Sequence, residues 1–249
     1  MKPTPLSTGQ EKFYRKLLHK KYREAEGLFL AGGKRVNREF IAAGWQPRAL
    51  LIRETANEHW HLPHATLYTV TERQLKTLSG VPTPQDVIGV YAIPTQETLP
   101  DSGFLLYLDR VADPGNLGTL IRTAAWFGLR GILLSPGSAD PWQPKVVRAS
   151  AGMMAHIPLF TGQTPATLTR MQNNGWYIWA THIQNGATLE QCAAGDKQIL
   201  LMGSEAHGLS DELTALADRT LHIRRTGRGE SLNLAAAAAI IMHHFSIKP

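Results

Sequence analysis

Residues 112–128 read ADPGNLGTLIRTAAWFG and combine two features that point to different functions. The stretch opens like a phosphate-binding loop, with Gly115 and Gly118 leading into a helix, but it has no lysine where such a loop carries one. An arginine, Arg122, stands inside the otherwise apolar helix. The stretch therefore predicts a strand-to-helix turn, and it leaves open what the helix does with the arginine.

Short apolar runs around this stretch predict buried strands. FLLYLD, GILLS, WYIWAT, QILLMG and TLHIR follow one another after residue 102, several of them without a polar interruption. Uninterrupted apolar strands are typical of a parallel sheet covered on both faces. Helical patterns alternate with these strands at 116–128, 144–151, 165–174, 211–217 and 231–245. This alternation predicts an α/β fold in which helices flank a parallel sheet.

The first 94 residues predict a separate, smaller α/β unit. QEKFYRKLLHKKYR at 10–23 has a helical pattern, and GLFLAGGKRVNREFIAAG predicts a strand, a glycine turn and a helix. ALLIRE, ATLYTV and VIGVYAIP predict strands, and TERQLKTLSG predicts a helix closed by a glycine. The polar segment TQETLPDSG contains proline and glycine, which is typical of a linker. The expected organisation is a domain at 1–94, a linker at 95–103 and a domain at 104–249.

Composition argues against several protein classes. The 249 residues are 43% hydrophobic, which suffices for a sizeable core, but no apolar run reaches the roughly 18 residues that span a membrane. The opening MKPTPLSTGQEKFYRK lacks the apolar segment of a secretory signal. The single cysteine, Cys192, excludes an intramolecular disulfide and suits a reducing compartment. We therefore expect a cytoplasmic protein with no membrane partner.

The net charge of +6 lies in the first quarter of the chain. Residues 1–60 hold 12 Lys and Arg against 6 Asp and Glu, whereas residues 61–249 hold 14 of each. A basic segment on a neutral body is typical of a nucleic-acid-binding surface, and a merely solvated basic tail is the alternative. The side chains expected to contact RNA are Lys12, Lys16, Lys20, Lys21, Lys34 and Arg35.

Three turns that bear glycine or serine follow predicted strands and open predicted helices. They are residues 112–128, GSEAHGLS at 203–210 and RRTGRGESLNLAAAAA at 224–239. Each turn alone has a structural interpretation, because glycines shape turns and Ser231 can cap a helix. Ligands of open parallel sheets bind beyond the carboxyl ends of the strands. The recurrence of such turns in one sheet therefore favours a shared site.

Several common motifs are missing from the sequence. Gly115 and Gly118 do not complete the G-x-G-x-x-G of a dinucleotide fold, and neither the G-K-[ST] of a phosphate loop nor the G-x-S-x-G of a nucleophile elbow occurs. HWHLPH at 59–64 has three histidines, but no carboxylate or cysteine stands at ligand spacing. A surface loop is the simpler interpretation, and no metal is expected.

The three turns together resemble the three motifs of the SpoU (TrmH-like) RNA ribose 2′-O-methyltransferases, in the SPOUT superfamily. DPGNLGTLIRTAAWFG is similar to the first motif, LMGSEAHGLS to the second and ESLNLAAAAAI to the third. The matching motif residues are Asn116 and Arg122, then Gly203, Glu205 and Gly208, and finally Ser231 and Asn233. PWQPKVVRASAGMMAHIPLF is also similar to the family's usual sequence, so the resemblance covers roughly residues 103–245.

The resemblance implies a fold, a cofactor and a reaction. The implied fold is a SPOUT-type parallel sheet flanked by helices, with a C-terminal trefoil knot that holds S-adenosylmethionine in a bent shape. The implied reaction moves the donor's methyl group to a ribose 2′-hydroxyl of structured RNA, and the implied assembly is a homodimer. The residues expected to hold the donor, largely through backbone groups, are Thr181, His182, Gly203, Ile223, Ser231 and Leu232.

Within this reaction the resemblance gives Arg122 the task of acting on the hydroxyl proton. A guanidinium group normally stays protonated at neutral pH and has no free lone pair, so it is a poor base. Arg122 therefore either becomes transiently basic, or orients the hydroxyl and a phosphate while another acceptor takes the proton, or forms a structural ion pair with Glu205. By motif position Asn116 would hold Arg122 or the ribose, and Glu205 would fix the arginine fork. Ser231 and Asn233 would fix the substrate or the donor's carboxylate.

Residues 1–94 resemble the ribosomal-protein-like substrate-binding domain that many family members carry. KKYREAEGLFLAGGKRVNREFIAAG is similar to its opening, but Gly32 and Gly33 stand where the family commonly has a glutamate–glycine pair. Such a domain favours ribosomal RNA of the 23S type over tRNA. A non-catalytic RNA-binding protein that kept the fold would require a broken motif, and base-methylating SPOUT enzymes commonly lack the asparagine–arginine motif.

Overall fold

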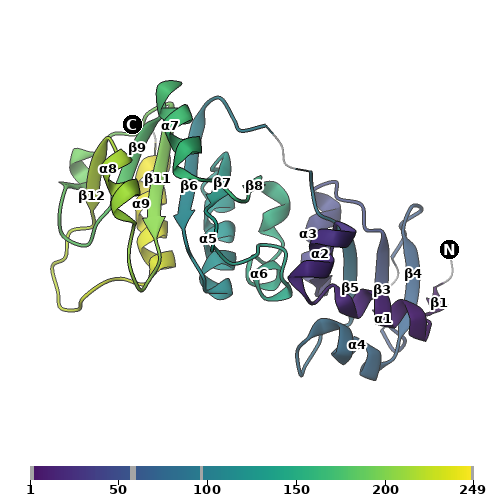
Figure 1. Ribbon diagram of the computed structural model, residues 1–249. Helices are drawn as coiled ribbons and strands as arrows, with labels where there is room; N and C mark the ends of the chain where they lie inside the picture. The colour runs from purple at the N-terminus through teal and green to yellow at the C-terminus, as the bar shows by residue number, and fades with distance from the viewer. Residues whose placement is uncertain (1–2, 57–59, 96–97, 248–249) are drawn as a thin grey trace. The chain divides into compact units, whose positions relative to one another are not determined.

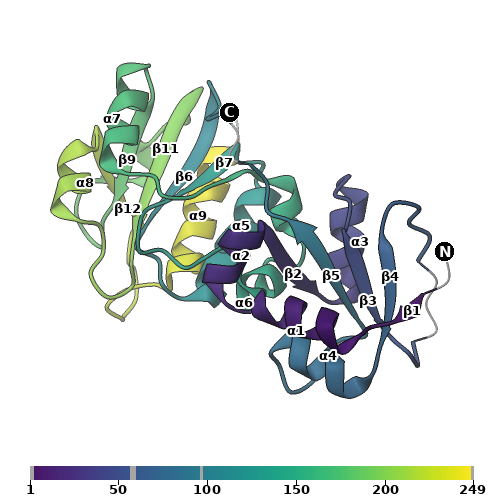
Figure 2. The same ribbon diagram turned by 45° about the vertical axis from the view of Figure 1, so that its right-hand side comes forward.

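The structure is a computed structural model that describes residues 3–56, 60–95 and 98–247. The chain forms two compact units, drawn in Figures 1 and 2. Unit 1 comprises Met1–Thr95 and Asp140–His156, and unit 2 comprises Gln96–Ala139 and Ile157–Pro249. The chain therefore passes between the two units three times.

Unit 1 is built on a five-stranded mixed sheet of order β1-β4-β3-β5-β2. β4 runs parallel to β1 and β3, whereas β5 runs antiparallel to both of its neighbours, β3 and β2. The strands are β1 (Thr4–Pro5), β2 (Leu28–Gly32), β3 (Ala49–Arg53), β4 (Thr66–Val70) and β5 (Val87–Ala92). The helices are α1 (Thr8–Lys16), α2 (Lys20–Glu26), α3 (Lys34–Ala42), α4 (Glu72–Ser79), α6 (Pro144–Ala149) and the 3₁₀ helix η1 (Met153–His156).

Successive residues of a strand point to opposite faces, so the two faces of the unit 1 sheet bury different sets of side chains. One face is aliphatic, with Leu30, Ile88 and Leu78 in a single cluster. The other face combines an aromatic group, in which the Phe40 and Tyr91 rings lie 4.8 Å apart between centroids, with an aliphatic cluster of Leu50, Ile52, Leu67 and Val87. The predicted small α/β unit is therefore present, with a core on each side of its sheet.

The helix predicted over 10–23 is wrong in one respect, because the structure has two helices there. α1 starts with a capping box at Ser7 and ends at Lys16, and α2 begins at Lys20. Arg23 points inward and donates from Nη1 to the carbonyl oxygen of Leu17 at 2.8 Å. The break therefore leaves a carbonyl group that a buried cation satisfies, which helical periodicity alone does not reveal.

Asp140–His156 packs within unit 1, although the sequence places it in the expected 104–249 domain. Its Asp140 accepts hydrogen bonds from the Arg23 guanidinium in a buried ion pair. Its Trp142 ring lies 5.0 Å from the Phe29 ring between centroids. Trp45 Nε1 also donates to the carbonyl of Ala155 at 3.1 Å. The compact units differ from the expected domains at this segment because its anchors lie in the first 45 residues.

Unit 2 is a seven-stranded sheet of order β10-β12-β9-β11-β6-β7-β8, and each strand pairing in it is parallel. Its strands are β6 (Gly103–Asp109), β7 (Gly131–Leu134), β8 (Leu159–Phe160), β9 (Tyr177–Thr181), β10 (Ala187–Thr188), β11 (Lys197–Gly203) and β12 (Arg219–His222). Its helices are α5 (Pro114–Trp126), α7 (Pro165–Asn173), η2 (Leu189–Gln191), α8 (Asp211–Leu216) and α9 (Leu234–Ser246). The predicted α/β fold with a parallel sheet is confirmed.

Helices cover both faces of the unit 2 sheet, as the uninterrupted apolar strands predict. Figures 1 and 2 show α5 and α9 on one face and α7 and α8 on the other. Phe245 of α9 packs on Phe104 and Trp179, with ring centroids 5.6 and 5.5 Å apart. Leu168 of α7 and Leu213 of α8 belong to the cluster on the opposite face. The trefoil knot stays a prediction from the resemblance.

No helix of the described residues is long and apolar enough to cross a membrane.

α9 begins at Leu234, three residues later than predicted, because the side chain of Asn233 caps it. The short edge strands β8 and β10 have two residues each, too few for a pattern that predicts them.

Candidate active site

The carboxyl ends of four neighbouring strands form one edge of the unit 2 sheet. Gly203, the last residue of β11, pairs with Asp109, the last residue of β6. On the other side, Leu221 of β12 pairs with Thr181, the last residue of β9. Because these strands are parallel, the segments that follow them emerge at the same edge. This is where an open parallel sheet binds ligands.

The three glycine- and serine-bearing turns meet at this edge through three polar side chains. The Asn116 amide donates to the carboxylate of Glu205, and the Asn233 amide donates to Asn116 Oδ1 at 3.4 Å. Asp113 holds the backbone of Asn116, because its carboxylate caps α5 and accepts the Asn116 N–H at 2.7 Å. Asn233 caps α9 by accepting the N–H of Ala235 at 2.9 Å. The expected shared site therefore has a physical junction, Asn116–Glu205–Asn233.

Arg122 lies away from this junction. It is exposed and makes no side-chain hydrogen bond or ion pair with the described part of the chain. The expected fork between Arg122 and Glu205 is wrong for this chain alone, because Glu205 is bonded to Asn116 instead. The reason is helix geometry: Arg122 is six residues beyond Asn116, about 9 Å further along α5.

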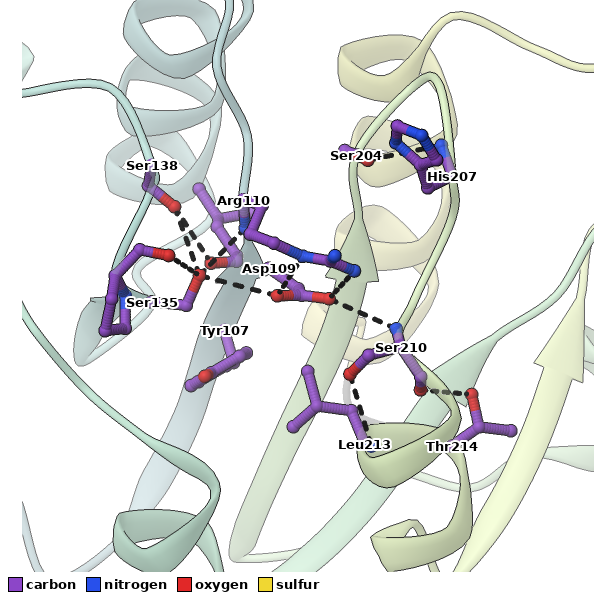
Figure 3. A network of polar contacts seen from close by, with 12 residues as sticks. Tyr107, Asp109, Arg110, Ser135, Ser138, Ser204, His207, Ser210, Leu213 and Thr214 are labelled. Carbon is purple, nitrogen blue, oxygen red and sulfur yellow. Dashed lines mark hydrogen bonds and ion pairs between the residues drawn. The ribbon is translucent and has the colours of Figure 1, made fainter.

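A second polar network, centred on Asp109, holds the loops of this edge in place (Figure 3). The Asp109 carboxylate is 4% exposed and accepts two hydrogen bonds from the Arg110 guanidinium, at 3.1 and 2.9 Å. It also accepts the backbone N–H of Ser210 at 3.1 Å and contacts the Ser135 hydroxyl at 3.5 Å. Asp109 thereby ties the ends of β6 and β7 to the 204–210 loop that carries Glu205.

Arg110 has an unusual backbone within this network. Its φ of +52° is in the left-handed region, which a non-glycine residue adopts at a cost of about 1 kcal/mol or more. The Ser135 hydroxyl accepts the Arg110 N–H at 2.8 Å, and the pairing with Asp109 holds its side chain. The neighbouring carboxylate also raises the pKa of Arg110. Sequence reasoning missed Asp109 and Arg110, and the only signal was a charged pair directly after an apolar strand.

Gly203 is required for close packing at the end of β11. A Cβ atom on Gly203 would lie 1.9 Å from the carbonyl carbon of Gly208 and 2.1 Å from the nitrogen of Leu209. The 204–208 turn therefore folds directly onto the strand end, and Gly208 supports it with a φ of +65°. Gly203 itself is buried under this turn, so glycine is needed here for the close approach of two backbone segments.

The other expected donor-binding residues lie at the same edge, but two of them have structural partners. The Thr181 hydroxyl donates to the carbonyl of Leu201 at 3.0 Å. His182 Nδ1 accepts the backbone N–H groups of Gln184 and Asn185, at 3.1 and 3.0 Å, and so shapes its own turn. Their side chains are therefore hydrogen-bonded within the protein, and the His182 N–H also donates to the carbonyl of Leu221 at 2.9 Å. Only the remaining backbone groups of these two residues are candidates for ligand contact.

The 223–233 segment fits the donor that the resemblance implies. Ile223 is partly buried beside β12, Ser231 is exposed, and Leu232 is a 53% exposed apolar side chain. Beside Ile223, the Nδ1 atom of His222 is buried without a hydrogen-bond partner among the described residues. An apolar side chain and an unsatisfied buried nitrogen at a strand end are features that an adenosine group can cover.

The six expected RNA contacts all lie in unit 1, and all are exposed except the partly buried Lys34. Lys16 lies over the Tyr22 ring at 5.5 Å, and Lys20 pairs with Glu24 at 3.6 Å on the helix surface.

The buried Cys192 thiol donates to the carbonyl of Thr188, and burial raises the pKa of the thiol. Cys192 thus has a packing role, and its position gives no reason to include it in the site.

Comparison with known proteins gives a consistent result for both units. The model of the SpoU rRNA Methylase family matches residues 103–243, and that of the MRM3-like substrate binding domain matches residues 10–89. The chain is 31% identical over 234 residues to the 23S rRNA (guanosine(2553)-2'-O)-methyltransferase RlmP of Bacillus subtilis, and the match covers 94% of each chain.

Two solved structures are similar over nearly the whole chain. The AdoMet-bound rRNA methyltransferase from Sinorhizobium meliloti has 29% identity and a TM-score of 0.83, with 97% of this chain and 95% of that chain covered. The SpoU methyltransferase AviRb from Streptomyces viridochromogenes has 25% identity and a TM-score of 0.85, with 96% of each chain covered.

Proposed function

The chain belongs to the SpoU rRNA methylase family, and from this premise we propose that it methylates one ribose 2′-hydroxyl in ribosomal RNA of the 23S type. It is an RNA 2′-O-ribose methyltransferase that uses S-adenosylmethionine. The observation that carries the assignment of the site is the junction of Asn116, Glu205 and Asn233, which joins the three motif turns at one edge of the sheet.

The donor would be held at the carboxyl ends of β9, β11 and β12, by backbone groups at Gly203, Ile223 and Leu232. When bound, it supplies a methyl group on a sulfonium that is already activated for transfer. The protein's task is therefore mainly to position the hydroxyl and to manage its proton. Glu205 is the carboxylate of the junction, and Asn116 fixes one of its oxygens. The other oxygen is available as an acceptor for a ribose hydroxyl.

We place the guanidinium of Arg122 at the ribose 2′-hydroxyl or an adjacent phosphate. Because Arg122 lies away from Glu205 within one copy, we propose that Arg122 of a second copy of the chain reaches this site. Thr119, Arg122 and Trp126 lie on the exposed stripe of α5, at spacings of three and four residues. Trp126 is 81% exposed, Ile240 of the neighbouring α9 is 42% exposed, and Ile247, directly after α9, is 57% exposed. Exposed apolar side chains at two packed helices, next to Arg122, support a homodimer.

A mixing experiment tests whether Arg122 acts in the partner's site. Arg122→Ala and Glu205→Gln homodimers should both be inactive. If Arg122 of one copy serves Glu205 of the other, a heterodimer of the two variants has one intact site and regains up to half of the activity. If both residues serve the same site within one copy, the mixture stays inactive. Trp126→Glu should yield monomers by light scattering, and an unchanged dimer mass would contradict the proposed interface.

Ribosomal RNA is proposed over tRNA because of unit 1. Its residues 10–89 match the model of the MRM3-like substrate binding domain, and it carries the basic first 60 residues. We assign RNA binding to residues 1–94 and methyl transfer to 104–249, with 140–156 packed on the RNA-binding part. Ribose methylation mapped across the rRNA of a strain that lacks the gene should show one missing 2′-O-methyl group. A site missing from tRNA instead would overturn the choice of substrate.

A further inference from the structure

Unit 1 contains a pocket of about 290 Å³ that the catalytic residues do not explain. Leu30 and Gly32 of β2 and Ile88 of β5 form its floor, and the 79–85 loop after α4 forms one wall. Pro144 and Arg148 of α6 complete the rim. Its volume is just below the roughly 300–1,000 Å³ of pockets for drug-sized ligands, which suits a single ring system.

Gly32 is what leaves this pocket open. It is the last residue of β2 and points to the same face as Leu30, opposite Ile88 in the register of the sheet. A Cβ atom on Gly32 would meet nothing within 4 Å, and its backbone is not in the left-handed region. No backbone strain or close approach therefore requires glycine here. A larger side chain at this position would occupy the space.

The charge and shape of the pocket indicate what it accepts. Arg148 is its only charged lining residue, is exposed, and makes no ion pair or side-chain hydrogen bond with the described residues. The floor is aliphatic, and Pro82, Pro84 and Pro144 give flat rigid edges. The Gln85 side chain also lines the pocket and offers both a hydrogen-bond donor and an acceptor. An apolar slot with one amide and one cation at the rim is complementary to a planar heterocycle that carries a phosphate.

We propose that this pocket binds one unpaired nucleobase of the RNA substrate, with the phosphate of that nucleotide on Arg148. The proposal rests on the proposed function, because it takes RNA as the substrate. Sequence-specific recognition of RNA mostly uses bases that are splayed out of loops and bulges, packed on side chains and read along their edges. Gln85 would read the edge, and Arg148 would hold the backbone without reading sequence. The pocket thus contributes to the choice of target and takes no part in the methyl transfer itself.

The test compares Gly32→Leu, which fills the pocket, with Gly195→Leu as a matched control. Gly195 also has open space around its Cβ position and no positive φ, and it lies in an exposed loop of unit 2. Each full-length variant is assayed for methyl transfer to 23S-type rRNA transcribed in vitro. Gly32→Leu should raise the KM for RNA about tenfold, the order of magnitude that one bound base contributes, and leave the KM for the donor unchanged. Gly195→Leu should behave as wild type.

Two further measurements distinguish a failure of the pocket proposal from a failure of the proposed function. Photo-crosslinking with 4-thiouridine-substituted rRNA should label peptides of 28–32 and 79–85 in wild type, and Gly32→Leu should abolish this labelling. Arg148→Gln, an exposed change that leaves the fold intact, should also raise the KM for RNA. If wild type methylates rRNA but Gly32→Leu and Arg148→Gln retain its KM and its crosslinks, the pocket proposal is wrong. If wild type methylates no rRNA, the proposed substrate fails instead, and crosslinking to total cellular RNA then decides the pocket alone.

Discussion

Gly203 and Gly32 each end a strand, and they have opposite reasons to be glycine. At Gly203 a Cβ atom would lie 1.9 Å from the backbone of the turn that follows, so the residue is small because two backbone segments touch. At Gly32 a Cβ atom would meet nothing, so the residue is small and leaves a space. The turn at the end of β11 is thus closely packed, and the floor of the unit 1 pocket has free space above it.

This difference separates the two tasks of a substrate-modifying enzyme. The unit 2 edge is fixed by polar contacts, from Asp109 to the 204–210 loop and from Asn116 to Glu205. Such preorganisation suits a reaction that depends on positioning. The unit 1 surface has exposed cations and an uncovered pocket, which suit a large ligand of variable shape. Substitutions at the unit 2 edge should abolish methyl transfer, and substitutions on the unit 1 surface should change the affinity for RNA.

The largest effect is expected for Arg122→Ala. Because Arg122 is exposed and has no partner among the described residues, its removal should leave folding and donor binding nearly unchanged. Methyl transfer should fall by about 10³-fold or more, roughly 4 kcal/mol of transition-state stabilisation. Arg122→Lys should not restore it, because an ammonium group does not reproduce the planar fork. Single-turnover transfer and calorimetric donor binding measure the two effects, and near wild-type transfer would remove Arg122 from the mechanism.

Arg23→Ala should affect unit 1 alone. The Arg23 and Asp140 side chains are 3% and 12% exposed, so removing the cation leaves a buried carboxylate without its partner. The free energy of unfolding of unit 1 should fall by about 3–5 kcal/mol. Lys20→Ala is the control, because the exposed Lys20–Glu24 pair contributes less than about 1 kcal/mol. A small destabilisation by Arg23→Ala in urea unfolding would show that the 140–156 segment is held by other interactions.

The meeting of the three turns at the unit 2 edge was predictable from the sequence, and the unit 1 pocket was not. Asn116, Glu205 and Asn233 each belong to a contiguous motif, and the turns of parallel strands are bound to meet at one edge. Within one copy of the chain Glu205 is bonded to Asn116 and not to Arg122, and the motif could not show this because it states which residues matter and not how far along a helix each lies. The pocket joins residue 32 to residue 148, and the packing of 140–156 on unit 1 depends on interactions that no local pattern encodes.

The contrast between the two glycines itself predicts a difference between Gly203→Ala and Gly32→Ala. Gly203→Ala should destabilise the protein by about 1–3 kcal/mol, because the 204–208 turn has to move away, and it should weaken donor binding with it. Gly32→Ala should be within about 1 kcal/mol of wild type, and on the stabilising side, because it restricts only the unfolded chain. Thermal unfolding with and without the donor measures both. Equal effects at the two positions would remove the contrast.

The smallest effect is expected for the basic helices. Changing Lys12, Lys16 and Lys21 to glutamine should reduce RNA affinity modestly and flatten its dependence on salt, by about one unit of log–log slope for each phosphate that is no longer neutralised. Lys76→Gln is the control, because Lys76 pairs with Glu72 at 3.2 Å on α4. Fluorescence anisotropy at several salt concentrations measures the slope. A slope that stays at the wild-type value would show that these lysines face only solvent.

The chemical identity of the product tests most directly whether the protein methylates a ribose 2′-hydroxyl and needs Arg122 to do so. The purified full-length protein is incubated with 23S-type rRNA lacking modifications and with S-adenosylmethionine that carries a labelled methyl group. The RNA is then digested to nucleosides and analysed by mass spectrometry. Wild type should give a single labelled 2′-O-methylnucleoside, and Arg122→Ala should give none. A methyl group on a base, or labelled product from Arg122→Ala at the wild-type rate, would contradict this prediction.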